Sequence, residues 1–522
     1  MNADALTAER IGLDWLRAAV APVGAFGRRH DERIAPYGPG DEAAAHDEIA
    51  EAVALAARLV PDEVGVVRAA LRALPEPTPI VARARAGDPL NDVDFYELGR
   101  FVDALDLLVR AWDSAGGEGP RRPPALDGVR AALAPGREQP GFYLADGFGP
   151  GLAAARAALA GAEAAVDRER ERIAAGVRDV LGIDPAGDEF VVLRDAYDGP
   201  VPGDVRIVRE TPTYRVLAIT VVAPQRDAAF AALADAEDAA RRVLSDRIAR
   251  EADAVTAVTR ALGALDRLLA RVAFAQRWGG CIPELRTTGI VFADATFAPL
   301  AAALAARGHR YTPLSLALAG VAVLTGPNMG GKSAALATAG FVCACAAFGV
   351  PPPAASASIP LLETIVWLGG DGPAERTRLL SSYAAEIVRA QRALGGASPR
   401  ALVLVDEFAR TTGPREGRAL LIAFAEALRS RAAFALAATH FDGVAEAAQV
   451  EHLRIAGLRH RAIAAIDGAD LDAALDAINA AMDYRVVDAR TGDPASDALA
   501  LAQLLGFDAA LVERARRLYD SE

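Results

Sequence analysis

The sequence predicts a multidomain protein: a mainly α-helical region with a small β tip, followed by a C-terminal α/β domain with a parallel sheet. Three observations predict it. Apolar residues recur at helical spacing through residues 1–182 and again from about 225 to 278. Short runs rich in β-branched residues fill 183–224. From about residue 282, apolar β runs alternate with helical patterns, which is typical of an α/β domain.

The helical region contains separate amphipathic runs. The clearest of them cover residues 47–59, 93–112 and 152–181. Segments rich in proline and glycine interrupt the pattern, at 36–40, 75–79 and 116–124. We therefore expect several helices in 1–182, the last of which is a long outgoing helix.

The β tip is expected to contain three strands, over 189–194, 204–208 and 214–222. The helical run that follows, from about 225 to 278, would span about 80 Å at ~1.5 Å per residue. A long helix out, a small tip and a long helix back predict a lever. Its parts are the outgoing helix within 1–182, the tip at 183–224 and the returning helix at 225–281.

Composition narrows the class of protein. Of the 522 residues, 52% are hydrophobic and 24% are charged, which is the balance of a globular protein rather than a disordered one. The formal net charge of −13 argues against a nucleic-acid binder without excluding one, because phosphate contacts need Lys and Arg. Three sparse cysteines, Cys281, Cys343 and Cys345, suit the reducing cytosol, and the latter two are interpreted as small buried hydrophobes. No signal peptide and no uninterrupted apolar run of ~18 residues is visible, so we expect a cytoplasmic protein without a membrane contact.

A phosphate-binding loop is the strongest motif. GPNMGGKS fits the pattern G-x-x-x-x-G-K-[ST], with a β run at 321–325 before it and a helical pattern after it. Glycines let backbone N–H groups curl around phosphates, and the helix N-terminus adds partial positive charge. Lys332 is expected to reach the β and γ phosphates, and Ser333 to ligate Mg²⁺. The predicted ATP-binding residues are Gly326, Pro327, Asn328, Met329, Gly330, Gly331, Lys332 and Ser333.

Two further strand ends carry polar residues. The apolar run 401–405 ends in Asp406, expected at the magnesium, and Glu407, expected to polarise the attacking water. The run 433–438 ends near His440, which is expected to touch the γ-phosphate or that water. Taken alone, Asp406 and Glu407 could be an acidic turn at a strand end, and His440 could be a structural histidine. Their order behind the phosphate-binding loop favours a catalytic role for Glu407 and His440.

The segment Thr325 to Ser333, TGPNMGGKS, resembles the form characteristic of the MutS mismatch-repair family, which has an ABC-like P-loop ATPase domain. The similarity continues in order through a signature segment, a Walker B with D-loop, and an A-T-H switch. The corresponding residues are 381–386, then Asp406 and Glu407 with Arg410 and Thr411, then 438–440. Residues 497–519 look like the family's closing helix-turn-helix. Weaker similarity upstream covers 94–101 and 264–269.

This resemblance implies an ATPase domain at 282–490 and a dimerisation segment at 491–522. It also implies a composite site, in which Ser381 or Ser382 faces the γ-phosphate bound by the other subunit. The partner is then a second copy or a MutS-like sister subunit. The sequence departs from the family pattern at Leu380 and Thr411, where glycines are usual. Phe297 stands near the place of an Arg-His-Pro motif, and we expect it to stack on adenine.

The first half does not resemble a mismatch-binding domain. Its one Phe-x-Glu, at Phe95 and Glu97, lies in an amphipathic helix, and we interpret it as core packing. The tip has four arginines against seven acids, a poor grip on DNA phosphates, and is interpreted as a protein-contact module. These residues are Arg194, Arg206, Arg209 and Arg215, and Asp184, Asp188, Glu189, Asp195, Asp198, Asp204 and Glu210.

Segments 311–316, 381–388, 406–410 and 482–485 resemble a subgroup, the MutS-like ATPases associated with lysine 5,6-aminomutase. That resemblance implies ATP-driven reactivation of a client aminomutase, whose cobalamin and PLP belong to the client. Two alternatives stay open. One is ATP-dependent binding of mismatched or branched DNA. The other is an interaction protein that dimerises on ATP with negligible hydrolysis.

Overall fold

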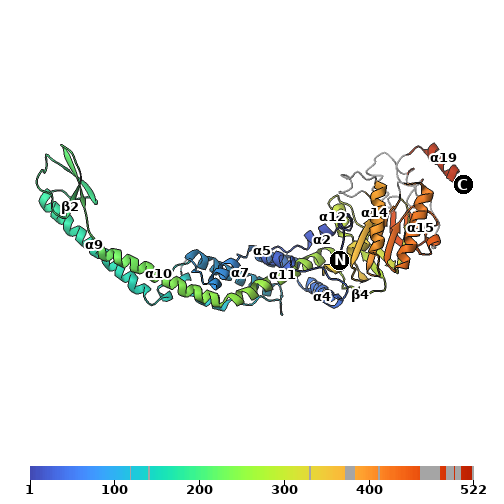
Figure 1. Cartoon of the computed structure of the whole chain (residues 1–522), viewed down its shortest axis with the longest axis horizontal. Coiled ribbons are helices and arrows are strands. Elements are labelled where there is room, and N and C mark those ends of the chain that lie inside the picture. Colours follow the sequence, from blue (N-terminus) through green and yellow to red (C-terminus); the bar gives the residue numbers. More distant parts are fainter. Residues whose placement is uncertain are drawn as a thin grey trace. The chain divides into compact units, whose positions relative to one another are not determined.

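The structure is a computed structural model that describes residues 1–117, 119–138, 141–327, 331–370, 382–409, 412–458, 482–489, 499, 502 and 507–519. The chain divides into two compact units (Figure 1). One contains Met1–Arg72, Ala111–Arg122 and Leu262–Glu522; the other contains Ala73–Arg110 and Pro123–Ala261. The first is called the sheet unit here and the second the helical unit. Their content confirms a multidomain, helix-rich chain with mixed sheets and a parallel α/β region.

The helical unit is built on two long helices, α9 (Leu152–Leu181) and α10 (Pro224–Arg250), which pack along each other. The predicted helix 152–181 is thereby confirmed. Three shorter elements flank α10: α6 (Thr78–Ala86), α8 (Asp127–Leu133) and η2 (Asp146–Phe148); η1 (Ala134–Arg137) packs on α8. Helix α7 (Asp92–Ser114) runs from this unit into the sheet unit. Phe95 in α7 is fully buried and packs against Phe142, as the core-packing interpretation predicted.

The prediction of one continuous helix from 225 to 278 is wrong. Helix α10 ends at Arg250, and α11 (Ala252–Trp278) begins two residues later. Glu251 between them leaves the helical conformation, with φ −88° and ψ 1°. Its carboxylate occupies the space that a side chain at Gly128 of α8 would fill. Apolar spacing continues across the break, so periodicity alone did not reveal it.

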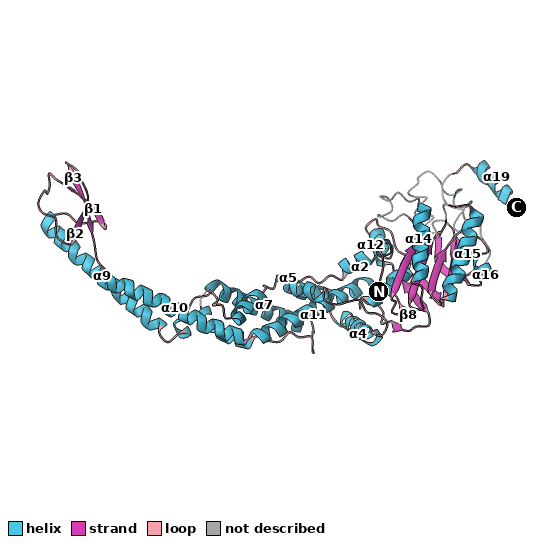
Figure 2. Ribbon diagram, in the orientation of Figure 1, coloured by secondary structure: helices cyan, strands magenta, loops and turns pink. Residues whose placement is uncertain are grey.

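The tip is a three-stranded antiparallel sheet in the order β1-β3-β2 (Figure 2). Its strands are β1 (Glu189–Leu193), β2 (Val205–Glu210) and β3 (Tyr214–Ile219). One face, including Phe190 and Leu217, packs against Val177 and its neighbours on α9. The three predicted strands are therefore present. The third is shorter than expected, because Pro224 already stands at the start of α10.

A six-stranded sheet forms the centre of the sheet unit, in the order β13-β12-β7-β11-β10-β9. All neighbouring pairs are parallel except β12 with β13. The strands are β7 (Val321–Thr325), β9 (Thr364–Leu368), β10 (Ala401–Asp406), β11 (Phe434–Ala438), β12 (Glu451–Leu458) and β13 (Met482–Asp488). The three apolar runs predicted as buried parallel strands are β7, β10 and β11.

A second sheet has four strands in the order β4-β8-β5-β6. They are β4 (Glu284–Leu285), β5 (Ile290–Ala295), β6 (Leu314–Leu318) and β8 (Ser356–Ile359). The helices described after residue 282 are α12 (Ala298–Ala305), α13 (Lys332–Ala347), α14 (Ser382–Gly395), α15 (Pro414–Ser430), α16 (Val444–Ala448) and α19 (Ala509–Tyr519). The predicted helix-turn-helix at 497–519 is described only in part. Helix α19 lies in its second half, and most residues of its first half, Gly506 among them, lie outside the described residues.

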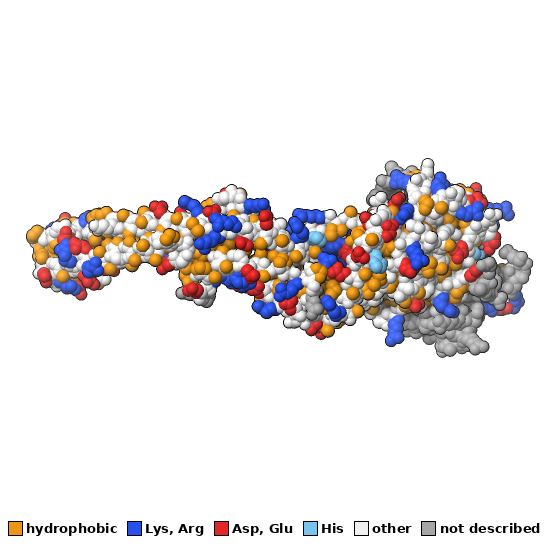
Figure 3. Space-filling model, turned by 90° about the horizontal axis from the view of Figure 1, so that it is seen from below, with side chains coloured by type: hydrophobic (Ala, Val, Ile, Leu, Met, Phe, Trp, Pro, Cys, Tyr) orange, Lys and Arg blue, Asp and Glu red, His pale blue; other side chains and the backbone are white. Residues whose placement is uncertain are grey.

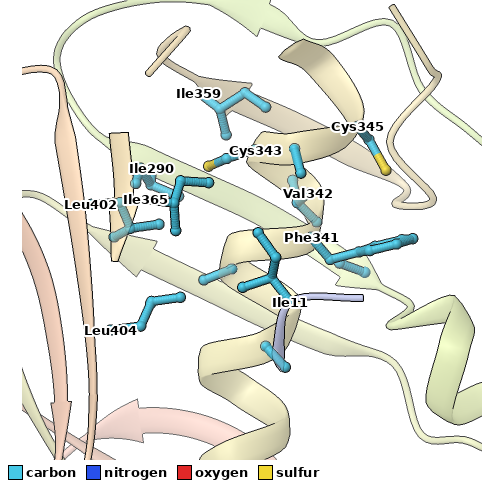
Figure 4. Packing of buried hydrophobic residues seen from close by; sticks show 14 of the residues in the cluster. Ile11, Ile290, Phe341, Val342, Cys343, Cys345, Ile359, Ile365, Leu402 and Leu404 are labelled. Atoms are coloured by element: carbon cyan, nitrogen blue, oxygen red, sulfur yellow. The ribbon is translucent and has the colours of Figure 1, made fainter. Parts of the chain in front are cut away.

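Helix α13 is buried along almost its whole length. Phe341 and Val342 lie in one apolar cluster with Ile11 from the N-terminus and Leu404 from β10 (Figure 4). Cys343 and Cys345 point into the same cluster and are free thiols, so they behave as the small buried hydrophobes that we predicted. Burial raises the pKa of Cys343 to about 12.

Five N-terminal helices complete the sheet unit: α1 (Ala5–Arg10), α2 (Leu13–Ala19), α3 (Ala25–Asp31), α4 (Glu42–Arg58) and α5 (Pro61–Ala73, whose last residue begins the helical unit). Helix α1 docks on β9. Asn2 forms a parallel bridge with Thr364, and the backbone N–H of Trp367 donates to Thr7 Oγ1 at 2.9 Å. Among the described residues, no helix combines the length and apolarity needed to cross a bilayer.

Candidate nucleotide site

The phosphate-binding loop follows β7 directly. Gly326 has φ +149° and Gly331, the N-cap of α13, has φ +87°, so both take backbone conformations that favour glycine. Lys332 begins α13 and its side chain turns back over the loop. Its Nζ donates to the carbonyls of Gly326 at 2.8 Å and Pro327 at 3.1 Å. The lysine charge is therefore held at the mouth of the loop. Asn328, Met329 and Gly330 lie outside the described residues.

Ser333 and Asp406 come together across the sheet edge. Ser333 Oγ donates to Asp406 Oδ1 at 3.0 Å, which joins the start of α13 to the end of β10. Oxygen ligands of this kind, a hydroxyl and a carboxylate, are those that Mg²⁺ prefers. The residues present therefore fit the predicted magnesium site.

Burial is the largest influence on the pKa of both Asp406 and Lys332. It raises the pKa of Asp406, and Glu407 beside it acts in the same direction, whereas the Ser333 hydrogen bond and the charges of Arg10 and Lys332 lower it. Burial also lowers the pKa of Lys332, against the attraction of Glu407 and Asp406. In both groups burial opposes the charged form, and the opposite charges nearby favour it.

Glu407 and His440 form the second pair. Glu407 Oε1 lies 2.8 Å from His440 Nε2, so the residue after β10 meets the segment after β11. Glu407 has φ +57°, an uncommon conformation for a residue with a side chain, and its N–H donates to the carbonyl of Ala438 at 3.0 Å. Strained backbone that its surroundings hold in place is a frequent feature of functional sites.

Parallel pairing explains why these groups converge. Asp406 is in register with Ala438, and Ala438 is in register with Leu324 just before the loop. The carboxyl ends of β7, β10 and β11 therefore meet at one edge of the sheet. Ligands of open α/β sheets bind outside that edge. The structure thus brings together Gly326, Pro327, Gly331, Lys332, Ser333, Asp406, Glu407 and His440.

The remaining predicted residues are not brought to this edge by the described contacts. Phe297 is the N-cap of α12 and its ring lies edge-on to Phe341, 5.5 Å between centroids, beside Gly12. Its stacking on adenine stays a prediction. Ser382 begins α14, but its side chain is outside the described set. Ser381, Arg410 and Thr411 also lie outside the described residues, as does Leu380.

Sequence reasoning missed two side chains near this edge. The ring of Tyr484 on β13 lies beside the loop: a Cβ added to Gly331 would be 3.1 Å from its Cδ1. The segment 482–485 was noted only for its family resemblance, and an aromatic at a strand position carries no sign of its neighbour. The second is Arg10 of α1, which is close enough to lower the pKa of Asp406.

A glycine loop that ends in a lysine and a serine, with two acids at the end of another parallel strand, is the arrangement of a P-loop nucleotide-binding domain. Residues 322–521 match the family model of MutS domain V. Endonuclease MutS2 of Pelotomaculum thermopropionicum is 27% identical over 397 residues, which cover 73% of this chain and 48% of that protein. Endonuclease MutS2 of Anaeromyxobacter sp. is 33% identical over 195 residues, covering 37% and 22%. The DNA mismatch repair protein MutS of Solibacter usitatus is 30% identical over 202 residues, covering 38% and 21%.

These matches support membership of the chain in the MutS family. The chain spans about half the length of the first of these relatives, and less of the other two. Two of these relatives carry the name of an endonuclease and the third that of a DNA mismatch repair protein. The proposed aminomutase subtype receives no support from them.

Proposed function

We propose that the chain is a cytoplasmic MutS-type ATPase that hydrolyses ATP with Mg²⁺ and couples the reaction to binding of mismatched or branched DNA. One observation carries the ATPase proposal: Lys332, the Ser333–Asp406 pair and the Glu407–His440 pair share one sheet edge. The names of the relatives support the DNA part.

The chemistry assigns each side chain a task. Lys332 and the loop N–H groups bind the β and γ phosphates, while Ser333 and Asp406 hold the magnesium. Mg²⁺, when bound, neutralises charge on the phosphates. Glu407 orients the attacking water and accepts its proton, and His440 holds the Glu407 carboxylate in position. Tyr484, beside Gly331, and Phe297 are the candidate contacts of the adenine base.

The second subunit completes the proposed site. In this proposal Ser381 or Ser382 reaches the γ-phosphate bound by the partner, and Arg410 and Thr411 form the D-loop at the interface. Residues 491–522 hold a homodimer or a heterodimer with a MutS-like sister subunit. The proposed domains are a helical core with an outgoing lever helix at 1–182, a tip at 183–224, a returning helix at 225–281 and an ATPase domain at 282–490.

The tip favours a second candidate function, an ATPase that remodels a protein client such as an aminomutase. Arg194 and Arg215 are engaged within the tip: both pair with Glu210, at 2.6 and 2.8 Å, and with Asp198, at 3.2 and 3.0 Å. Positive and negative side chains are interspersed there (Figure 3). Arginines bound to acids of their own domain have less charge to offer to DNA phosphates.

Hydrolysis measured with each candidate ligand separates the two functions. We would compare ATP turnover of the purified chain alone, with mismatched or branched duplexes, and with inactivated lysine 5,6-aminomutase. Stimulation by DNA, with an affinity that falls as salt rises, supports the DNA function. Stimulation by the aminomutase alone overturns it in favour of the protein client.

A further inference from the structure

Helix α1 carries an arginine to the edge of the sheet at which the nucleotide site lies. The helix follows β9 in the same direction, from the bridge of Asn2 with Thr364 to the hydrogen bond between Thr7 and Trp367. Arg10 is the last residue of this helix, and Ile11 after it is fully buried. Both ends of α1 are therefore fixed, and the exposed side chain of Arg10 stands at the carboxyl end of β9.

Gly370 makes room for that side chain, and Gly369 before it lies against the backbone of Asp406. Leu368 of β9 is in register with Val405 of β10, so Gly369 lies level with Asp406. A Cβ at Gly369 would come within 1.9 Å of the Asp406 carbonyl oxygen, and one at Gly370 within 2.7 Å of Arg10 Nη2. Only residues without side chains fit at both places, since both also have positive φ. The guanidinium thus lies against the backbone, next to the strand end that carries Asp406.

Four charged side chains meet at this edge of the sheet. Asp406 and Glu407 contribute two carboxylates, and Lys332 is one cation that faces them. Arg10 adds a second cation from the opposite side of β10, and its field reaches the Asp406 carboxyl. Triphosphate with magnesium is more negative than diphosphate with magnesium, so an additional cation matters most for the terminal phosphate.

A different arginine at a helix end shows the contrasting arrangement. Arg17, in the last turn of α2, pairs with Asp14 at 3.4 Å and lies over the ring of Phe348, 5.3 Å from its centroid. That arginine is used within its own surroundings. Arg10 instead lies against Gly370, beyond the carboxyl end of β9, a position that a role limited to the α1 dipole does not require.

We propose that Arg10 is a phosphate ligand of the same subunit, whose guanidinium contacts the terminal phosphate of ATP and makes the site prefer ATP over ADP. This inference rests on the proposed nucleotide-binding function. Because an arginine presents several donors in a fixed plane, it suits the oxygens of a phosphate. The N-terminal helix then becomes part of the nucleotide site and detects the state of hydrolysis.

Equilibrium binding tests the inference without relying on turnover. Titration calorimetry with Mg²⁺ would compare a non-hydrolysable ATP analogue with ADP for the wild-type chain, Arg10→Gln, Arg10→Lys and the control Arg17→Gln. We expect Arg10→Gln to weaken binding of the analogue about tenfold and that of ADP less than about twofold. Arg10→Lys should recover part of the loss, and Arg17→Gln should bind both nucleotides as the wild type does. Thermal unfolding of each variant checks that α1 stays docked.

The outcomes separate this inference from the proposed function. Equal weakening of both nucleotides by Arg10→Gln, or no weakening of either, overturns the role of Arg10 while nucleotide binding by the wild type stands. A wild-type chain that binds neither nucleotide contradicts both proposals. Loss of analogue binding by Arg17→Gln to the same degree as by Arg10→Gln also counts against a specific contact.

Discussion

His440 Nε2 lies 2.8 Å from Glu407 Oε1, and this contact joins two strand ends that are 33 residues apart in the sequence. Both side chains are partly exposed, 44% for His440 and 28% for Glu407, so the pair faces the space outside the sheet edge. A carboxylate fixed by a neighbouring imidazole has fewer orientations to lose before it accepts a proton.

Replacing the imidazole tests that relationship. We expect His440→Ala to lower kcat by about 10- to 100-fold and to leave KM for ATP nearly unchanged, because Glu407 loses its orientation while the phosphate contacts remain. Steady-state hydrolysis over a range of ATP concentrations measures both constants. A raised KM with an unchanged kcat would mean that His440 acts in binding instead.

Asp406 is predicted to control the magnesium requirement. Asp406→Asn removes the charge that faces Ser333 Oγ across 3.0 Å. The Mg²⁺ concentration for half-maximal ATP binding should rise about 10-fold or more, since a neutral amide is a weaker ligand. Binding of a fluorescent ATP analogue, titrated with Mg²⁺, gives this number. Asp246→Asn, an exposed position on α10, is the control, and an equal shift in both variants would refute a specific role.

Gly331 is predicted to tolerate no side chain. Alanine there would adopt φ +87° and place its Cβ 3.1 Å from Tyr484. We expect Gly331→Ala to distort the loop and to weaken ATP binding by about tenfold or more. Gly320→Ala is the matched control, because it lies in the turn before β7 with open space around its Cβ. Normal ATP affinity of Gly331→Ala would show that the loop geometry is not required.

Tyr37 is predicted to make stability depend on alkaline pH. Its hydroxyl donates to Glu48 at 2.5 Å, and its N–H donates to the Ala347 carbonyl at the end of α13. Burial first, then the Glu48 contact, raises the pKa of Tyr37 to about 12. A raised pKa in the folded state stabilises the fold below the unfolded value near 10, and this contribution is lost as the pH rises toward about 12.

We therefore expect Tyr37→Phe to lower the free energy of unfolding by about 1–2 kcal/mol near neutral pH. The difference from the wild type should shrink between pH ~10 and about 12. Urea unfolding at several pH values measures it. Tyr143→Phe is the control, because its hydroxyl bonds Glu138 at 3.2 Å on the surface. A difference that stays constant up to pH 12 would contradict the assigned cause.

The convergence of the strand ends could be predicted from the sequence. Asp406, Glu407 and His440 each follow an apolar run, and parallel strands present their carboxyl ends at one edge. That rule predicted one shared site for these residues, and in the structure Glu407 contacts His440 while Ser333 donates a hydrogen bond to Asp406. Their roles in catalysis remain predictions. The glycines before Lys332 likewise predicted a tightly curved loop, because glycine adopts backbone conformations that other residues avoid.

Contacts between segments far apart in the chain could not be predicted from the sequence. Arg10 reaches the site because α1 packs on a strand more than 350 residues later, through Thr7 and Trp367. Tyr484 reaches Gly331 from the antiparallel strand at the sheet edge. Neither neighbour leaves a periodic or local signal. The break at Glu251 also leaves no local signal, and its carboxylate lies against Gly128 on another helix.

The most direct test of the central claim is ATP hydrolysis by the purified chain with Mg²⁺, compared with Glu407→Gln. We expect both proteins to bind ATP with similar affinity. Glu407→Gln should release phosphate at least about 100-fold more slowly, because the carboxylate that accepts the proton is gone. Equal rates of phosphate release from the two proteins, or no release from either, would contradict the claim that this sheet edge is an ATPase site.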